Sequence, residues 1–236
     1  MEEAHYDIRE TEDGQYMLTL TVDEEYLAGA QYPVTIDPTT TWRSDPWIKD
    51  AYVIKGSTYG DINFYDSGNT AMSVGKATQG QTRTYLRLDK LAATLQGNCV
   101  VSGKLYLYEN GSYATSNNIQ IRRVTESFKL STVTWNTQPS YGETIATVTT
   151  NGTSGHELVA DVTEHLRKLA VGTYTNYGLM LRNADETNSK YTKLYGTRHA
   201  TTSKTPKMVV KYVDGPLRRQ RHTFHRDMRK KTVRSH

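Results

Sequence analysis

Apolar and polar side chains alternate along much of the chain, most clearly from Thr82 to Asp89. Successive side chains of a β-strand point to opposite faces, so this alternation predicts a strand with one apolar and one polar face. The apolar face carries Thr84, Leu86 and Leu88, and the polar face carries Arg83, Tyr85, Arg87 and Asp89. The polar face is either ordinary solvated sheet or a binding surface for a planar, acidic ligand.

Similar short runs recur from residue 51 onward, with Gly and Asn between them. Many short strands joined by turn residues predict an all-β fold, an antiparallel β-sandwich of the jelly-roll kind. The expected strands cover residues 51–54, 71–74, 83–89, 100–108, 119–124, 144–149, 157–161, 177–182, 190–195 and 207–213.

One segment has a helical pattern instead. Asp161 to Thr163 can cap a helix in which Leu166 and Leu169 share a face, and Gly172 can end it. The sequence therefore predicts one short helix on the end of the sandwich.

The chain divides into four parts. Residues 1–38 form a small β unit, with an alternating run from Tyr16 to Val22, and this unit is expected to be the end of an upstream β domain. Residues 39–46 are expected to be a linker and residues 47–215 the sandwich. Residues 216–236 are expected to be a basic, disordered tail. Trp42 in the linker and Trp47 directly after it could pack the two units together.

Charge is unevenly distributed. The net charge is +4, but the last 21 residues carry eight Lys or Arg against Asp227 alone, which leaves the first 215 residues with 21 basic and 24 acidic residues, or about −3. The tail is either a solvated extension or a segment that binds a polyanion. Cys99 is the only cysteine, so the sequence predicts neither an internal disulfide nor a cysteine-based metal site.

No stretch reaches the roughly 20 apolar residues of a membrane span. The polar start, Met1 to Glu10, does not read as a signal peptide. The chain is therefore expected to be either cytoplasmic or an internal piece of a longer secreted protein.

The order of motifs over roughly residues 47–213 resembles the DNRLRE domain, a secreted bacterial and archaeal module related to disaggregatase repeats and to a carbohydrate-binding family. The matching pieces are Asp50–Val53, Val74–Gly75, Arg83–Asp89, Leu105–Tyr108, Arg123–Thr125, Ser131–Pro139, Asp161–Thr163, Asn176–Leu179 and Pro206–Tyr212. The run Tyr32–Pro38 resembles the segment that precedes such modules in large wall-associated proteins with RHS-type repeats. The resemblance implies an extracellular or cell-surface protein that binds a polysaccharide.

This chain departs from the family pattern at three positions. Phe128 and Leu169 stand where the family usually has tryptophan, and Leu130 stands near a usual glutamate. These are expected to be core or supporting positions.

The candidate ligand-binding residues are basic and aromatic side chains interleaved at period two. Aromatic rings stack on the C–H faces of sugars, and arginine pairs with uronate carboxylates, so this pattern suits an acidic polysaccharide. The alternative is a solvated antiparallel face whose tyrosines and lysines support the sheet. The candidates are Arg83, Tyr85 and Arg87 on one strand, Lys104, Tyr106 and Tyr108 on what is expected to be its neighbour, and Tyr191 and Lys193 on a later strand.

Trp135 belongs to a short alternating run that ends at Gln138–Pro139. Its ring is either a platform on which a ligand stacks or an anchor of the core. A core anchor is the preferred interpretation, because a tryptophan among β-formers usually buries its ring.

An oxygen-rich loop offers a candidate metal site. Asp50, Asp61, Asn63 and Asp66 could hold a structural calcium ion, which prefers six to eight oxygen ligands. The same residue types are ordinary turn formers, and the spacing is not that of an EF-hand. No other cofactor is expected.

The search for catalytic residues is negative. The chain has no Gly-x-Ser-x-Gly, no HExxH and no Gly-rich phosphate loop, and no histidine lies near Cys99 in sequence. The sequence thus predicts a non-catalytic, monomeric module that binds an acidic or uronate-containing polysaccharide, with no specific nucleic acid partner. The alternatives are a structural or adhesion spacer without a sugar ligand and, less favoured, a polysaccharide lyase.

Overall fold

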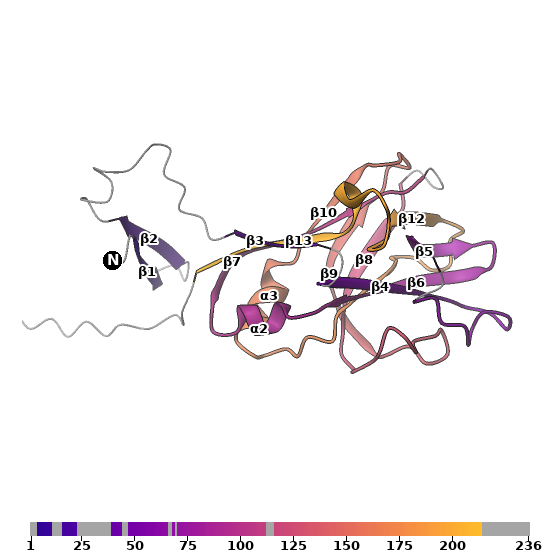
Figure 1. The fold of residues 1–236 in the computed structure, drawn as a ribbon, viewed down its shortest axis with the longest axis horizontal. Helices are drawn as coiled ribbons and strands as arrows, with labels where there is room; N and C mark the ends of the chain where they lie inside the picture. Colours follow the sequence, from indigo (N-terminus) through magenta and orange to yellow (C-terminus); the bar gives the residue numbers. More distant parts are fainter. Residues whose placement is uncertain are drawn as a thin grey trace, which may run out of the picture.

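The computed structural model describes residues 4–10, 16–22, 39–43, 47–65, 68, 70–111 and 116–213. Residues 39–213 of this set form two antiparallel β-sheets stacked as a sandwich (Figure 1). The predicted all-β sandwich is therefore confirmed.

The smaller sheet has four strands in the order β10-β7-β13-β3. Its central strands are the long β7 and the last strand β13, which pair over seven positions with a shift between Lys211 and Tyr212. The strands are β3 (Thr39–Arg43), β7 (Cys99–Tyr108), β10 (Glu157–Asp161) and β13 (Lys207–Val213).

The larger sheet has seven strands in the order β12-β5-β6-β11-β8-β9, with β4 paired to β6. Strand β6 is its centre, because β4 pairs along one side while β5 and β11 share the other. The strands are β4 (Ile48–Ile54), β5 (Ala71–Ala77), β6 (Gly80–Leu88), β8 (Asn118–Val124), β9 (Tyr141–Thr149), β11 (Leu179–Asn183) and β12 (Tyr191–Tyr195).

The main core lies between the two sheets. Leu86 and Leu88 of β6 are buried in it, as the alternation predicts, and Leu105 and Leu107 of β7 pack in the same cluster from the other sheet. Burial of apolar side chains from both inner faces is the main stabilising contribution to such a sandwich.

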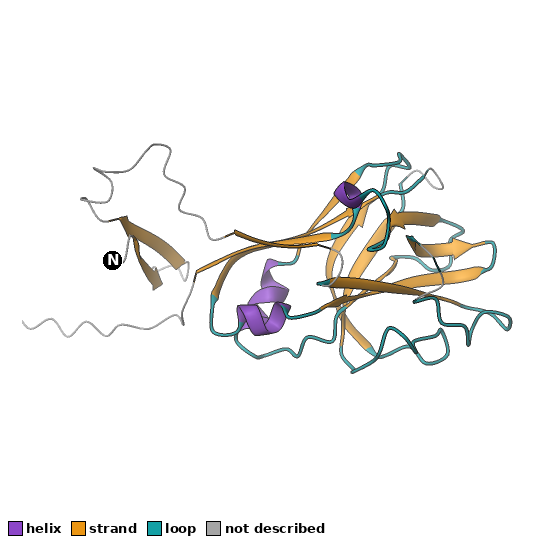
Figure 2. Ribbon diagram, viewed as in Figure 1, coloured by secondary structure: helices purple, strands orange, loops and turns teal. Residues whose placement is uncertain are grey.

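Two α-helices lie together at one end of the sandwich (purple in Figure 2). The predicted helix is α3 (Thr163–Ala170), where an Asp161 carboxylate oxygen accepts the Thr163 backbone N–H at 2.9 Å and Leu166 and Leu169 are buried. Gly172 follows with φ +76°, which glycine adopts without strain. Helix α2 (Leu91–Leu95) and a 3₁₀ turn (Thr202–Lys204) were not predicted.

The ten strands predicted in the sandwich are all present. The predicted bounds 157–161 and 207–213 match β10 and β13, and the other strands differ at their ends by up to three residues. No helix among the described residues is long and apolar enough to cross a membrane.

The N-terminal unit contains an antiparallel hairpin of β1 (Ala4–Glu10) and β2 (Tyr16–Val22), in which Ala4 pairs with Val22. The run Tyr32–Pro38 and the predicted disordered tail at 216–236 lie outside the described residues.

The expected linker is wrong over residues 39–43, because they form β3 and pair with β13. Trp42 is 5% exposed and belongs to the core between the sheets, and Trp47 packs on the same cluster. Trp42 therefore anchors the sandwich itself. Residues 44–46 are not among those described.

Candidate functional site

A cleft of about 580 Å³ lies where strands β4, β5 and β12 meet the segment between β4 and β5. Its lining combines aromatic rings with small polar side chains. The lining residues are Tyr52, Ile54, Tyr59, Phe64, Gly68, Thr70, Ala71, Ser73, Ala77, Gln79, Thr82, Asn110, Gly111, Tyr191 and Lys193.

Four aromatic rings contribute to this cleft. Tyr52 and Phe64 stack with their ring centroids 4.7 Å apart and their planes 13° from parallel, and Tyr59 lies 6.4 Å from Phe64. The Tyr191 hydroxyl lies 3.0 Å from the Ser73 hydroxyl, which fixes the fourth ring on β12. The lining is therefore an ordered set of ring faces and edges.

The charge of the cleft is set by Lys193. Among the described lining residues there is no carboxylate. Burial, with a smaller contribution from nearby Tyr191, raises the pKa of Tyr52, so its phenol stays neutral and can donate a hydrogen bond. The described cleft thus presents aromatic surface, neutral hydroxyls and one cation.

Buried Glu109 supports one rim of the cleft. Its carboxylate accepts the backbone N–H groups of Asn151 at 2.8 Å and Gly152 at 2.9 Å, and it lies 2.8 Å from His156 Nδ1. Its backbone forms a bridge with Leu194, and the next residue, Asn110, donates its N–H to the Lys193 carbonyl. Glu109 therefore ties β7 to β12 beside the cleft.

Two of the lining residues, Tyr191 and Lys193, were predicted from the sequence as ligand-binding residues, whereas Tyr52, Tyr59 and Phe64 were not. The missed residues have a signal in the sequence, because aromatic side chains are concentrated between residues 52 and 65. A period of two does not detect them, since Tyr59 and Phe64 lie outside the strands.

The predicted polar face of β6 is not a solvated surface. Tyr85 is fully buried in a second apolar cluster on the outer side of the larger sheet, with Val53, Val133 and Met180. Burial strongly raises the pKa of Tyr85. Tyr85 therefore has no exposed surface with which to contact a ligand in this structure.

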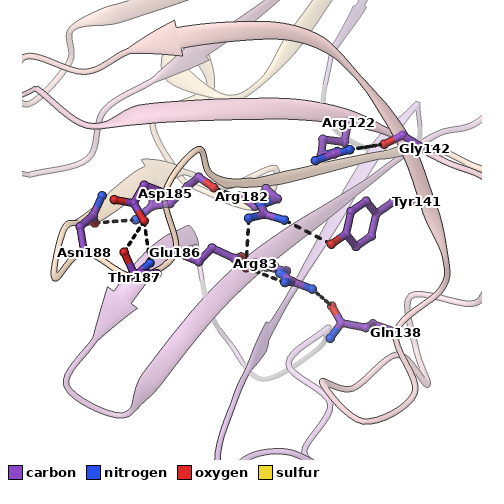
Figure 3. A network of polar contacts seen from close by, with 11 residues as sticks. Arg83, Arg122, Gln138, Tyr141, Gly142, Arg182, Asp185, Glu186, Thr187 and Asn188 are labelled. Carbon is purple, nitrogen blue, oxygen red and sulfur yellow. Dashed lines mark hydrogen bonds and ion pairs between the residues drawn. The ribbon is translucent and has the colours of Figure 1, made fainter.

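Arg83 is engaged by protein groups on several sides (Figure 3). Two of its nitrogens donate to Glu186 at 2.7 and 2.6 Å, and a third donates to Gln138 at 2.9 Å. Arg182 contacts the same Glu186 at 3.2 Å. The Arg83 guanidinium also lies 4.6 Å from the Trp135 ring centroid. These contacts make Arg83 a structural residue of this region.

The β8–β9 loop (residues 125–140) covers this face. Asn63 fixes it by donating from its side-chain amide to the carbonyls of Leu130 at 2.8 Å and Val133 at 2.7 Å. Trp135 and Phe128 are partly buried and pack against the second cluster, which agrees with the preference for Trp135 as a core anchor and with the supporting role of Phe128. Leu130 and Leu169 are also buried.

Arg87 lies at the margin of this covered face. Its side chain is 30% exposed, and it donates to the Phe128 carbonyl at 3.3 Å and lies 4.0 Å from Asp89. Whether Arg87 contacts a glycan stays a prediction.

Lys104, Tyr106 and Tyr108 lie on β7 in the smaller sheet, so the expected adjacency to β6 is wrong. Tyr106 lies under the Lys207 ammonium group, 4.2 Å from the ring centroid. Tyr108 is 5% exposed and donates to Glu157 at 2.7 Å, and burial together with this carboxylate raises its pKa to about 12. The eight candidate residues therefore lie in three separate regions of the sandwich.

The candidate calcium ligands make contacts with protein groups. Asp50 is buried and accepts hydrogen bonds from the backbone N–H of Thr197 at 2.8 Å and from the Thr197 hydroxyl, while Asp61 accepts from Asn136 at 2.8 Å. Asn63 holds the β8–β9 loop, and Asp66 lies outside the described residues. Within the described part of the chain, no three His, Cys, Asp or Glu side chains cluster as metal ligands, and the calcium site stays a prediction.

Two stacked antiparallel sheets with an aromatic-lined cleft define a class of β-sandwich suited to ligands with flat apolar faces and many hydroxyls. The sequence model of carbohydrate-binding module family 96 matches residues 41–212, and the chain therefore belongs to this family. The match begins within β3, in agreement with the place of this strand in the sandwich. No curated protein matches the chain.

Proposed function

We propose that the protein is a non-catalytic module that binds an acidic, uronate-containing polysaccharide in the aromatic cleft, as part of a larger secreted or cell-wall-associated protein. The observation that carries this proposal is the stacked pair of Tyr52 and Phe64 beside Tyr191 and Lys193 in a single cleft. Membership of a carbohydrate-binding family supports the class of ligand.

The aromatic rings account for recognition of a sugar as such. A pyranose ring has an apolar C–H face that packs on an aromatic ring, while its hydroxyls need hydrogen-bond partners. Ser73, Gln79 and Asn110 line the same cleft and offer hydroxyl and amide groups of both polarities.

Lys193 accounts for the preference for an acidic sugar. A carboxylate gains a charge-assisted hydrogen bond from an ammonium group, and no described carboxylate of the lining opposes it. A neutral glucan would gain the stacking alone.

The chemistry of the lining supports binding without catalysis. A general base works best when its pKa is near the working pH, whereas burial moves the pKa of Tyr52 upward. Affinity for one short oligosaccharide is expected to be modest, because a shallow site offsets only part of the cost of association.

Replacement of Tyr191 by alanine tests the cleft. Affinity electrophoresis of the full chain through gels containing polygalacturonate is expected to show binding about tenfold weaker for Tyr191→Ala, since loss of roughly 1.4 kcal/mol of stacking changes the constant by that factor. Tyr195→Ala is the matched control, because Tyr195 lies on the same strand and face but does not line the cleft. Equal retardation of the two variants would contradict the assignment of the cleft.

Replacement of Lys193 by glutamine tests the acidic preference. Lys193→Gln is expected to bind polygalacturonate about fivefold more weakly and to keep any retardation by a neutral glucan. The control is Lys76→Gln, because Lys76 is an exposed residue of β5 outside the lining, and this variant is expected to keep both kinds of retardation. Both variants retain the basic tail, so its contribution cancels in the comparison. Absence of retardation of the wild-type chain by every glycan would favour the spacer function instead.

A further inference from the structure

The outer face of the four-stranded sheet carries a row of side chains that runs across its strands. The register places Val159 of β10 beside Tyr106, Tyr106 beside Lys207, and Lys207 beside Arg43 of β3. Leu105 of β7 and Met208 of β13 are buried in the core, so Tyr106 and Lys207 point outward. Four strands at a spacing of about 4.8 Å give the row a length of about 14 Å.

This face is open to solvent where it is described. Val159 is 43% exposed, and Arg43 is exposed at the opposite end of the row. The Tyr106 ring is half-buried with the Lys207 ammonium group 4.2 Å from its centroid. An aromatic ring beside a cation can stack on a sugar face while the cation meets a carboxylate.

The centre of the face is positively charged. Lys104 is exposed on the next row, beside Asp161, and Lys211 is exposed one row further along, which adds two cations to Lys207 and Arg43. Two carboxylates share the face, but both belong to β10 at its margin and accept hydrogen bonds from protein groups. These carboxylates are Glu157, which accepts the Tyr108 hydroxyl, and Asp161, which accepts the Thr163 N–H.

We propose that this face, which we call the cationic sheet face, is a second binding surface for an extended polyuronate chain. The inference rests on the proposed function for the class of glycan, but the surface shares no residue with the cleft and belongs to the other sheet. An extended polymer with regularly spaced carboxylates matches a row of cations and an aromatic ring, whereas a short oligosaccharide fits the cleft. One module therefore holds two glycan chains at once.

Two sites on a monomer cross-link a soluble polymer, and this is the property to test. The full chain is mixed with polygalacturonate, and light scattering is followed as the protein concentration rises. Binding of a short galacturonate oligosaccharide is measured in parallel by titration calorimetry. The variants are Lys104→Ser with Lys207→Ser, and separately Tyr106→Ala. The charge-matched control is Lys55→Ser with Lys129→Ser, both exposed and outside the two surfaces.

The expected result is that the Lys104/Lys207 variant binds the oligosaccharide within about twofold of wild type and scatters at least about fivefold less light with the polymer. Tyr106→Ala is likewise expected to keep oligosaccharide binding and to scatter less light with the polymer, and the control is expected to behave as wild type. Cross-linking equal to the control would overturn the second surface and leave the cleft standing. A loss of the same size with double-stranded DNA would overturn its assignment to a glycan.

The two proposals fail in different ways. If the wild-type chain binds no oligosaccharide while polymer binding still depends on Lys104 and Lys207, the cleft is wrong and the cationic sheet face stands. All the replaced side chains point outward, and thermal unfolding of each variant shows whether the fold is retained.

Discussion

Arg83 joins three segments of the chain at a single residue. Its ion pair with Glu186 fixes the β11–β12 connection, and its hydrogen bond to Gln138 fixes the β8–β9 loop over β6 (Figure 3). Its guanidinium also lies over the Trp135 ring of the same loop. The side chains of Arg83 and Glu186 are only 12% and 18% exposed. An ion pair so shielded from water depends on both partners, because either charge alone is poorly solvated.

Arg83→Ala is expected to lower the free energy of unfolding by about 3 kcal/mol, since it leaves Glu186 with one arginine and removes the support of Trp135. Arg87→Ala is the control and is expected to cost under about 1 kcal/mol, because its ion pair with Asp89 is long and exposed. Urea unfolding of both variants measures the difference. Equal costs would show that the Arg83 network does not stabilise the fold.

His165 is buried in α3 with no hydrogen-bond partner for its Nδ1. Burial lowers its pKa to about 4, and the positive charges of Arg123 and Lys168 act in the same direction while Glu143 opposes them. The unfolded chain, with an ordinary histidine, binds a proton at a higher pH than the folded chain does.

The wild-type protein is therefore expected to lose up to about 3 kcal/mol of stability as the pH falls from about 6.5 to about 4. His165→Phe, which replaces the imidazole by a ring that does not titrate, is expected to flatten this part of the profile. Urea unfolding midpoints of both proteins across this pH range provide the measurement. Parallel profiles would mean that His165 is not responsible for the loss.

At the scale of elements, β3 closes the edge of the four-stranded sheet with a buried tryptophan. Trp42 lies in the core between the sheets, whereas Trp47 is half-buried and has the Lys90 ammonium group 4.8 Å from its ring. If residues 39–46 were only a linker, replacing either tryptophan would leave the stability of the sandwich unchanged.

Trp42→Ala is expected to cost about 4 kcal/mol, because it leaves a large cavity in the core. Trp47→Ala is expected to cost less than half as much, since its ring is already partly in water. Chemical unfolding of the full chain, followed by near-ultraviolet circular dichroism of the sandwich, compares the two. A small effect of Trp42→Ala would mean that β3 is dispensable.

Strands with clear alternation could be predicted almost to their ends, as β10 and β13 show. The five residues of α2 are too few for a helical period to emerge. β3 escaped prediction because its sequence, Thr-Thr-Thr-Trp-Arg, has one apolar residue and no alternation. Its place is set by pairing with β13, some 170 residues away.

At the scale of the whole molecule, period two correctly separated the two faces of β6 but did not show what covers each. The cover over Tyr85 is the β8–β9 loop, held by Asn63 from a distant segment. The cleft likewise joins β4, β5 and β12, so only its β12 members, Tyr191 and Lys193, were predicted. Contacts between segments that are distant in sequence determine both the burial of Tyr85 and the lining of the cleft, and a local pattern of residues does not contain this information.

Strands β3 and β13 also determine how the module would respond to tension. Thr39, the first residue of β3, pairs with Lys211 near the end of β13, so the chain enters and leaves the sandwich at the same end of two neighbouring antiparallel strands (Figure 1). A pulling force on the two flanking segments would separate this pair like a zipper, breaking its hydrogen bonds one after another rather than all together. The module would open at low force, so it is better suited to lie beside a load-bearing chain than to carry the load itself.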